Sequence, residues 1–166
     1  MKTKLILFYC FLGLNSISRS NGATNLQCRV NKFSISTNTT KIVFFSSNKT
    51  REDKFRNSQA SILSKTEIDL VEKILNTCVN QFNRQESKFL KLKGPVIKIS
   101  GYSRQYVVAL TKNGDKQVWV NCFCNEQDDK WRKQIVFVFD GGPYYFNLKI
   151  NVTTRKWYEL IVNGQG

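Results

Sequence analysis

Four cysteines remain in this chain once an N-terminal export signal is set aside: Cys28, Cys78, Cys122 and Cys124. An even number of cysteines in an exported protein permits disulfide bonds, and four allow three pairings. Cys122 and Cys124 face the same side of an expected strand, with Cα atoms roughly 6.5–7 Å apart, at the limit of disulfide geometry. We therefore expect Cys78 to pair with one of them. The alternative is that all four are small, buried apolar side chains.

No metal centre, redox pair or cofactor is expected from these thiols. Thiolate zinc sites show two to four residues between neighbouring ligands, whereas a single residue separates Cys122 from Cys124. The chain also contains no histidine. This absence excludes Ser-His and Cys-His nucleophile systems and histidine-ligated metals.

Catalysis by a pair of carboxylates remains chemically possible, but the acidic residues occupy positions that usually face solvent. Most fall in expected loops or on the polar face of an expected helix: Glu52, Asp53, Asp69, Glu72, Asp128 and Asp129. Only Asp140 and Glu159 stand near expected strands, and Asp140 precedes Gly141-Gly142, where a carboxylate caps a turn. The sequence therefore predicts a protein that is not an enzyme.

Aromatic and basic side chains make the better candidate site. Trp119, Phe123, Tyr145 and Lys149 share one outward parity if the cysteine face of the sheet is covered. Together with the basic residues Lys88, Lys91 and Lys93 they could bind a partner. The alternative is that the aromatic residues are core or cross-strand packing.

The positive charge of the chain favours acidic partners, which include anionic glycans, lipid head groups and nucleic acid. Of these we expect an anionic or protein partner rather than a nucleic acid, and the alternative is a protein whose positive faces bind nothing specific. The chain holds 26 basic and 12 acidic residues, a net charge of +14. Removal of Lys2, Lys4 and Arg19 with the signal leaves 23 basic residues against 12 acidic ones, a net charge of +11. We expect salt-sensitive binding to an anionic matrix.

The first residues have the pattern of a secretory signal. Met1-Lys2-Thr3-Lys4 is a charged start, Leu5 to Leu14 is almost wholly apolar, and small residues follow. The apolar run is too short for a spanning helix, which needs about 20 residues. We expect residues 1–22 to be a signal peptide and the protein to be secreted, either periplasmic or extracellular, with no transmembrane segment afterwards.

One amphipathic helix is predicted over residues 66–85. Ser64 and Glu67 fit a capping box at its start. Apolar residues then recur at three- and four-residue steps: Ile68, Val71, Leu75, Cys78, Val79 and Phe82. The polar residues Asp69, Glu72, Lys73, Asn76, Asn80 and Asn83 are expected on the outer side.

Strands are predicted on both sides of this helix. Before it, residues 23–65 read as an N-terminal arm with a possible hairpin, Arg29–Ser36 and Lys41–Phe45, and a mobile polar loop over 46–59. After it, Asn113-Gly114 marks a tight hairpin. The expected strands are Val96–Ser100, Gln105–Thr111, Gln117–Asn125, Gln134–Asp140, Tyr144–Asn151 and Trp157–Val162, with Gln134–Asp140 central because it is apolar on both sides. Residues 66–166 thus form one α+β domain.

This order of one helix followed by an antiparallel meander resembles the cystatin-like and nuclear-transport-factor-like folds, in which a curved sheet grips one helix. The second fold implies an alternative function, a small-ligand carrier or pocket enzyme with an ionisable group in a cavity. The first implies inhibition of papain-type proteases. Here Gln117 to Asn121 departs from the inhibitors' Gln-x-Val-x-Gly hairpin, and Pro143 is followed by Tyr144 rather than Trp.

Residues 102–166 also resemble a family of small, uncharacterised exported proteins. The shared residues are Val118-Trp119-Val120-Asn121-Cys122-Phe123-Cys124, Asp140-Gly141-Gly142, Phe146-Asn147-x-Lys149-x-Asn151 and Val162-Asn163-Gly164. The resemblance implies export but no particular activity. The prediction is therefore an exported, basic interaction module.

Overall fold

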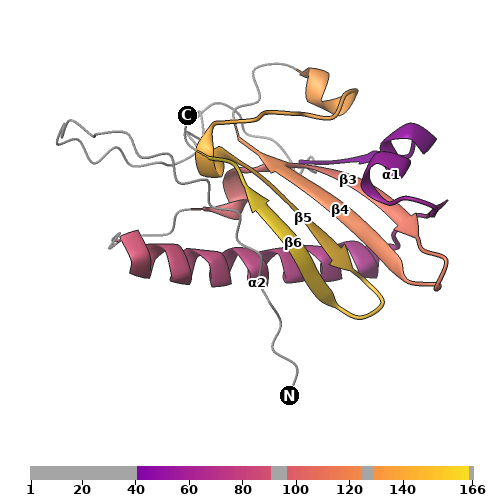
Figure 1. Ribbon diagram of the computed structural model, residues 1–166, viewed down its shortest axis with the longest axis horizontal. Helices are drawn as coiled ribbons and strands as arrows, with labels where there is room; N and C mark the ends of the chain where they lie inside the picture. Colours follow the sequence, from indigo (N-terminus) through magenta and orange to yellow (C-terminus); the bar gives the residue numbers. More distant parts are fainter. Residues whose placement is uncertain (1–40, 91–96, 125–128, 165–166) are drawn as a thin grey trace.

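The computed structural model describes residues 41–90, 97–124 and 129–164. Within these ranges the chain forms an α+β domain of two α-helices and an open, six-stranded mixed sheet. The long helix α2 (Lys65–Leu90) lies against one face of the sheet, called here the inner face. The short helix α1 (Asn48–Lys54) lies over the opposite, outer face (Figure 1).

The sheet is built on the predicted antiparallel meander. Its strands are ordered β1 (Ile42–Phe45), β3 (Ser103–Leu110), β4 (Lys116–Phe123), β5 (Tyr145–Asn151) and β6 (Lys156–Val162). Neighbours from β3 to β6 run antiparallel. The sequence did not predict that β1 pairs in parallel with β3, nor that β2 (Gln59–Ala60) pairs antiparallel with the same strand farther along. The parallel pairing of β1 makes the sheet mixed.

The capping box at the start of α2 is confirmed. The amide of Glu67 donates to Ser64 Oγ at 3.3 Å, and the amide of Ser64 donates to Glu67 Oε2 at 2.7 Å. These bonds satisfy two amides that a helix start otherwise leaves without partners. The helix runs on to Leu90, five residues beyond its predicted end at position 85.

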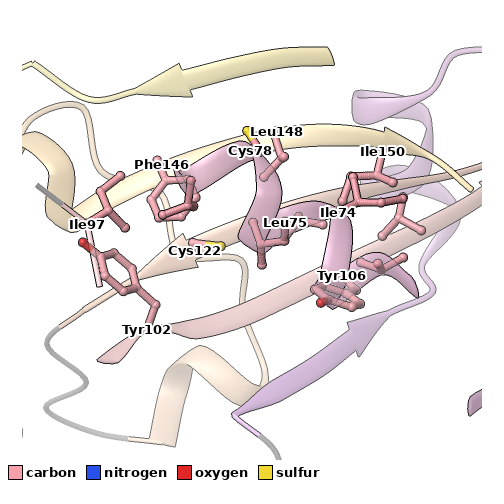
Figure 2. Packing of buried hydrophobic residues seen from close by; sticks show 14 of the residues in the cluster. Ile74, Leu75, Cys78, Ile97, Tyr102, Tyr106, Cys122, Phe146, Leu148 and Ile150 are labelled. Atoms are coloured by element: carbon pink, nitrogen blue, oxygen red, sulfur yellow. The ribbon is translucent and has the colours of Figure 1, made fainter. Parts of the chain in front are cut away.

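The core between α2 and the sheet is closely filled. Val71, Leu75 and Cys78 of α2 have no solvent-accessible area, and neither have Val118, Val120, Leu148 and Ile150 of the sheet. Figure 2 shows Ile74, Leu75 and Cys78 among the side chains of the strands. A side chain without accessible area lines no space that could admit a water molecule. These residues therefore form a packed core rather than a ligand cavity.

The segment Gln134–Asp140, predicted to be a central strand, is instead a strap across the outer face of the sheet. That prediction was wrong because an apolar run suits a surface strap as well as a buried strand. Its backbone is bonded to side chains of the sheet, not to a neighbouring strand: Gln105 and Asn121 bond Val136, and Asn163 bonds Val138. In Figure 1 this orange segment runs on the side opposite α2.

Two further expectations differ from the structure, and two others fall outside the described residues. The predicted mobile loop over 46–59 contains α1, whose first turn is capped by Ser47 Oγ accepting from the Thr50 amide at 3.2 Å. The part of the predicted strand Val96–Ser100 that the structure describes is irregular and ends in a 3-10 turn, Ile99–Gly101. The signal peptide and the possible strand Arg29–Ser36 lie outside the described residues.

Asn83 and Glu72 were expected on the polar outer side of the helix, and both contact the protein interior. The side chain of Asn83 is buried and bonds the backbone of Ile97 twice, each at 2.8 Å. Glu72 accepts a hydrogen bond from Tyr106 and pairs with Arg104 at 3.2 Å. The helical pattern missed them because β3 reaches beyond the apolar stripe at Glu72, and the irregular segment at Ile97 does so at Asn83.

Candidate functional site

The structure places the four predicted sheet residues on the same outer face. Trp119 is paired in register with Lys149, and Phe123 with Tyr145, across β4 and β5. Lys88 belongs to the last turn of α2, whereas Lys91 and Lys93 lie outside the described residues. The shared parity of the four is therefore confirmed, and their role in binding stays a prediction.

The Phe123 end of this face is covered. The 3-10 turn Asp129–Arg132 places Trp131 against Phe123, with ring centroids 5.6 Å apart. Phe123 is 2% exposed and Trp131 is 4% exposed. These rings are packing partners, and neither offers a face to an incoming ligand.

The Trp119 end carries two lysines laid over aromatic rings. The ammonium group of Lys54, from the end of α1, lies 4.2 Å from the centroid of the Trp119 ring. The ammonium group of Lys149 lies 5.4 Å from the ring of Phe55 and 6.0 Å from the ring of Tyr158. Such distances are typical of cation–π contacts. We call Lys54, Lys149, Phe55, Trp119 and Tyr158 the lysine cluster.

Positive charge in the lysine cluster is only partly compensated. Lys149 forms an ion pair of 2.8 Å with Glu159, whose side chain is 56% exposed. Lys54 has no carboxylate within 4.0 Å among the described residues. Burial lowers the pKa of Lys54; the charge of Asp53 opposes this, and the charge of Lys149 adds to it. An anion bound beside Lys54 would offset the electrostatic repulsion between the ammonium groups of Lys54 and Lys149.

Side-chain hydrogen bonds hold the rings beneath the lysines. Trp119 Nε1 donates to Asn147 Oδ1 at 3.1 Å, and Tyr158 Oη donates to Gln117 Oε1 at 2.6 Å. Burial raises the pKa of Tyr158 to about 12, so its hydroxyl stays protonated near neutral pH. The rings are therefore fixed, and Trp119 is only 5% exposed. The lysine ammonium groups, rather than the rings, are what this site offers to a ligand.

Sequence reasoning found Trp119 and Lys149 but missed Lys54 and Phe55. Both were assigned to a mobile loop because the segment from Ser46 to Gln59 is polar. Ser47 followed by Thr50 was the available sign of a helix start, since serine favours the N-cap position. A seven-residue helix gives too short a pattern for its buried side to be recognised.

The expected pairing of Cys78 with Cys122 or Cys124 is wrong. Cys78 and Cys122 are free, buried thiols in the core. Burial raises the pKa of Cys78 to about 12 and that of Cys122 further still. Thiols with such pKa values are poor nucleophiles and metal ligands near neutral pH. Cys124 is buried on the same inner face and is not among these free thiols, and Cys28 lies outside the described residues.

A polar cluster joins α2 to β3 on the inner face. The hydroxyl of Tyr106 donates to Glu72 Oε1, and Arg104 Nη2 lies 3.2 Å from Glu72 Oε2. Burial is the main cause that raises the pKa of Tyr106. Arg104 also donates to the carbonyls of Ile99 and Tyr102. These contacts tie the helix to the sheet and the 3-10 turn, and we assign the cluster a structural role.

An apolar groove of about 250 Å³ opens where β1 and β2 leave a gap along β3. Its lining residues are Phe44, Phe45, Ser46, Ser61, Ile62, Leu63, Ile68 and Val108. The lining contains no acidic, basic or thiol side chain. Acid–base chemistry in this groove would therefore have no group to carry it.

Neither a metal site nor a membrane-spanning helix occurs in the described part of the chain. No group of three or more cysteine, aspartate or glutamate residues there is placed to hold a metal ion. No helix there is both long and apolar enough to cross a bilayer. Comparison with protein-family models, with curated proteins and with solved structures finds no match.

Proposed function

We propose that this chain is an exported, basic, non-enzymatic interaction module that binds an anionic partner at the lysine cluster. One observation carries the proposal: the ammonium groups of Lys54 and Lys149 both lie over rings of the outer face, where the charge of Lys149 lowers the pKa of Lys54, and only Lys149 has a carboxylate partner among the described residues. Rigid rings beneath the lysines limit the conformational entropy that the lysines lose on binding. The net charge, +14 for the full chain and +11 without residues 1–22, adds long-range attraction for an anion.

The wider distribution of charge agrees with this location. The acidic residues of α2 are largely occupied within the molecule, since Glu67 pairs with Lys116 and Glu72 pairs with Arg104. On the outer face Lys149 keeps a single, half-exposed carboxylate partner, Glu159. Sulfate, carboxylate or phosphate groups presented on a polymer would match this pair of cations.

The experiment compares two double variants with equal net charge on a sulfated polysaccharide column. Lys54→Gln with Lys149→Gln removes both ammonium groups of the lysine cluster. Lys65→Gln with Lys73→Gln removes two exposed ammonium groups from α2. We expect the first variant to elute at clearly lower salt than the wild type, and the second to stay close to the wild type. Circular dichroism checks that both variants are folded.

Two results contradict the proposal. Equal losses of retention in the two double variants would mean that binding follows net charge rather than the lysine cluster. Retention that does not change between about 50 and 500 mM salt would mean that exposed charges do not carry the interaction, since they are screened over this range. Substitution of Lys88, Lys91 and Lys93 tests separately whether the end of α2 contributes.

We also propose that α2 packs on the sheet as in the cystatin-like fold, because the order of helix and meander agrees with that fold. No observation favours protease inhibition, since Gln117–Asn121 lies inside β4 rather than in a hairpin loop. A ligand carrier or pocket enzyme with an ionisable group in its cavity is not favoured either, since Val71, Leu75 and Cys78 have no accessible area and the apolar groove along β3 has no ionisable lining residue.

A further inference from the structure

The strap, residues 134–140, is held to the sheet along one side only. Gln105 is fully buried, and its amide group contacts the strap at two points: it donates to the carbonyl of Gln134 and accepts from the amide of Val136. It also donates to the carbonyl of Trp131 in the turn before the strap. Asn121 donates to the carbonyl of Val136 at 2.9 Å. The strap therefore lies on a row of side-chain amides.

The row continues across the sheet to β6. Asn163, just beyond β6, donates to the carbonyl of Val138 at 2.6 Å and to that of Asp140 at 3.0 Å. The bonded backbone groups thus belong to every second residue: Gln134, Val136, Val138 and Asp140. A two-residue period is that of an extended chain, in which alternate residues direct their backbone groups to opposite sides.

The other side of the strap has no partner. Within the described ranges, the backbone N–H and C=O groups of Phe137 and Phe139 make no hydrogen bond. Their side chains are 67% and 86% exposed, and the two rings meet edge to face at 4.8 Å. The strap therefore combines an open backbone edge with exposed apolar side chains, which is the arrangement that accepts an added strand.

We infer that the strap is a strand-addition edge for an extended, acidic segment of a different protein. Charge complementarity selects this occupant. Lys133 is exposed at the start of the strap and has no ion pair among the described residues, while Ile135 to Phe139 carry no charge. An uncharged, β-branched peptide with acidic residues at one end would pair with the backbone and place its charge beside Lys133.

A second copy of this chain is a poorer occupant. Two copies would each bring a net charge of at least +11 to the contact, the value without residues 1–22, and such repulsion opposes association. The exposed apolar side chains of the strap, two phenylalanines, also fall short of the roughly 800 Å² per partner that a stable interface buries. Binding at this edge is independent of the lysine cluster, since it rests on backbone groups rather than on ammonium groups.

The test uses labelled synthetic peptides of eight residues, in which alternating valine and threonine carry two aspartates at either the N- or the C-terminus. Fluorescence anisotropy measures their binding to the full chain. The better of the two peptides is then compared with a copy whose alternate backbone amides are N-methylated. We expect N-methylation to weaken binding by at least about tenfold, because it removes two or more ladder hydrogen bonds and leaves the side chains intact.

Two variants of the protein test the contribution of the strap's backbone without any change in the peptide. Phe137→Thr removes the ring and keeps the backbone N–H, whereas Phe137→Pro removes both. Neither variant breaks a hydrogen bond of the described structure. We expect Phe137→Pro to bind the peptide at least about tenfold more weakly than Phe137→Thr.

Three results would overturn the inference. The first is an absence of binding by both peptides up to about 1 mM, the weak end of specific recognition. The second is equal binding of the plain and N-methylated peptides. This result refutes the inference by itself, so the test does not depend on whether Phe137→Pro folds. The third is a concentration-dependent dimer in sedimentation that Phe137→Pro abolishes, because the occupant would then be a second copy. Loss of the lysine cluster leaves peptide binding unchanged if both proposals are right.

Discussion

Single side chains in this protein take their roles from what surrounds them rather than from their type. Lysine is a residue type that usually lies on the surface, yet Lys54 lies over Trp119 and burial lowers its pKa. Cys78 and Cys122 belong to a chain with features of export, yet both are free thiols within the core. The sequence pattern missed α1, which carries Lys54, whereas it placed Cys78 and Cys122 on a helix and a strand that bury them without pairing them.

Removal of the Asn83 side chain should destabilise the fold. Its side chain bonds the N–H and the C=O of Ile97, so it satisfies two backbone groups beside the end of α2. Asn83→Ala leaves those groups without partners and should lower the free energy of unfolding by about 2 kcal/mol. Urea denaturation of the full chain measures the change.

Asn80→Ala is the matched control for Asn83→Ala. Asn80 is exposed on the same helix, and alanine has the better helix propensity, so this variant should be neutral or slightly more stable than the wild type. If the two variants were equally stable, the pair of bonds to Ile97 would not contribute to stability.

Elements are joined in this fold by a few polar contacts around an apolar core. The ion pair of Lys116 with Glu67, at 2.6 Å, connects the start of β4 to the first turn of α2. The Glu72 cluster connects the middle of α2 to β3, and Asn83 connects its later part to Ile97. The helix is thus tied to the sheet at three places along its length.

The ion pair at the start of α2 predicts a pH dependence. The hydrogen bond from Lys116, followed by that from the Ser64 amide, lowers the pKa of Glu67. The unfolded chain therefore binds a proton at higher pH than the folded chain does. The stabilisation is present above the ordinary glutamate pKa of about 4.3 and is lost as pH falls through the lowered folded value.

Lys116→Met should reduce the part of acid destabilisation that Glu67 supplies. Near pH 7 we expect the variant to be less stable than the wild type by no more than about 1 kcal/mol, because the pair is partly exposed. The difference between the two proteins should shrink as pH falls from about 5 to 3. Thermal unfolding across this range measures it, and a constant difference would contradict the assigned role of the pair.

The elements with long, regular patterns could be predicted from the sequence. The capping box of Ser64 with Glu67 marked the start of α2, and Asn113-Gly114 marked the hairpin between β3 and β4. The outward parity predicted for Tyr145 and Lys149 agrees with the structure, in which Phe146, Leu148 and Ile150 of β5 are in the core. The strap could not be predicted, because its apolar residues fit a buried strand equally well.

In the whole molecule, the two faces of the sheet differ in how far other elements cover them. The inner face is covered by α2, apart from the apolar groove beside Val108. The outer face is only partly covered, by α1 at one end and by the segment after β4 at the other (Figure 1). The lysine cluster and the strap both belong to this outer face, so a partner would engage the molecule from that side.

The direct test of the central claim is a nuclear magnetic resonance titration of the full chain with a sulfated hexasaccharide. We predict that the indole N–H signal of Trp119 and the side-chain signals of Lys54 and Lys149 shift together and saturate. The pKa of Lys54 should rise toward its ordinary value, since the bound anion stabilises the ammonium form. Shifts at Lys65 and Lys73 without shifts at Lys54, Lys149 and Trp119 would contradict the account.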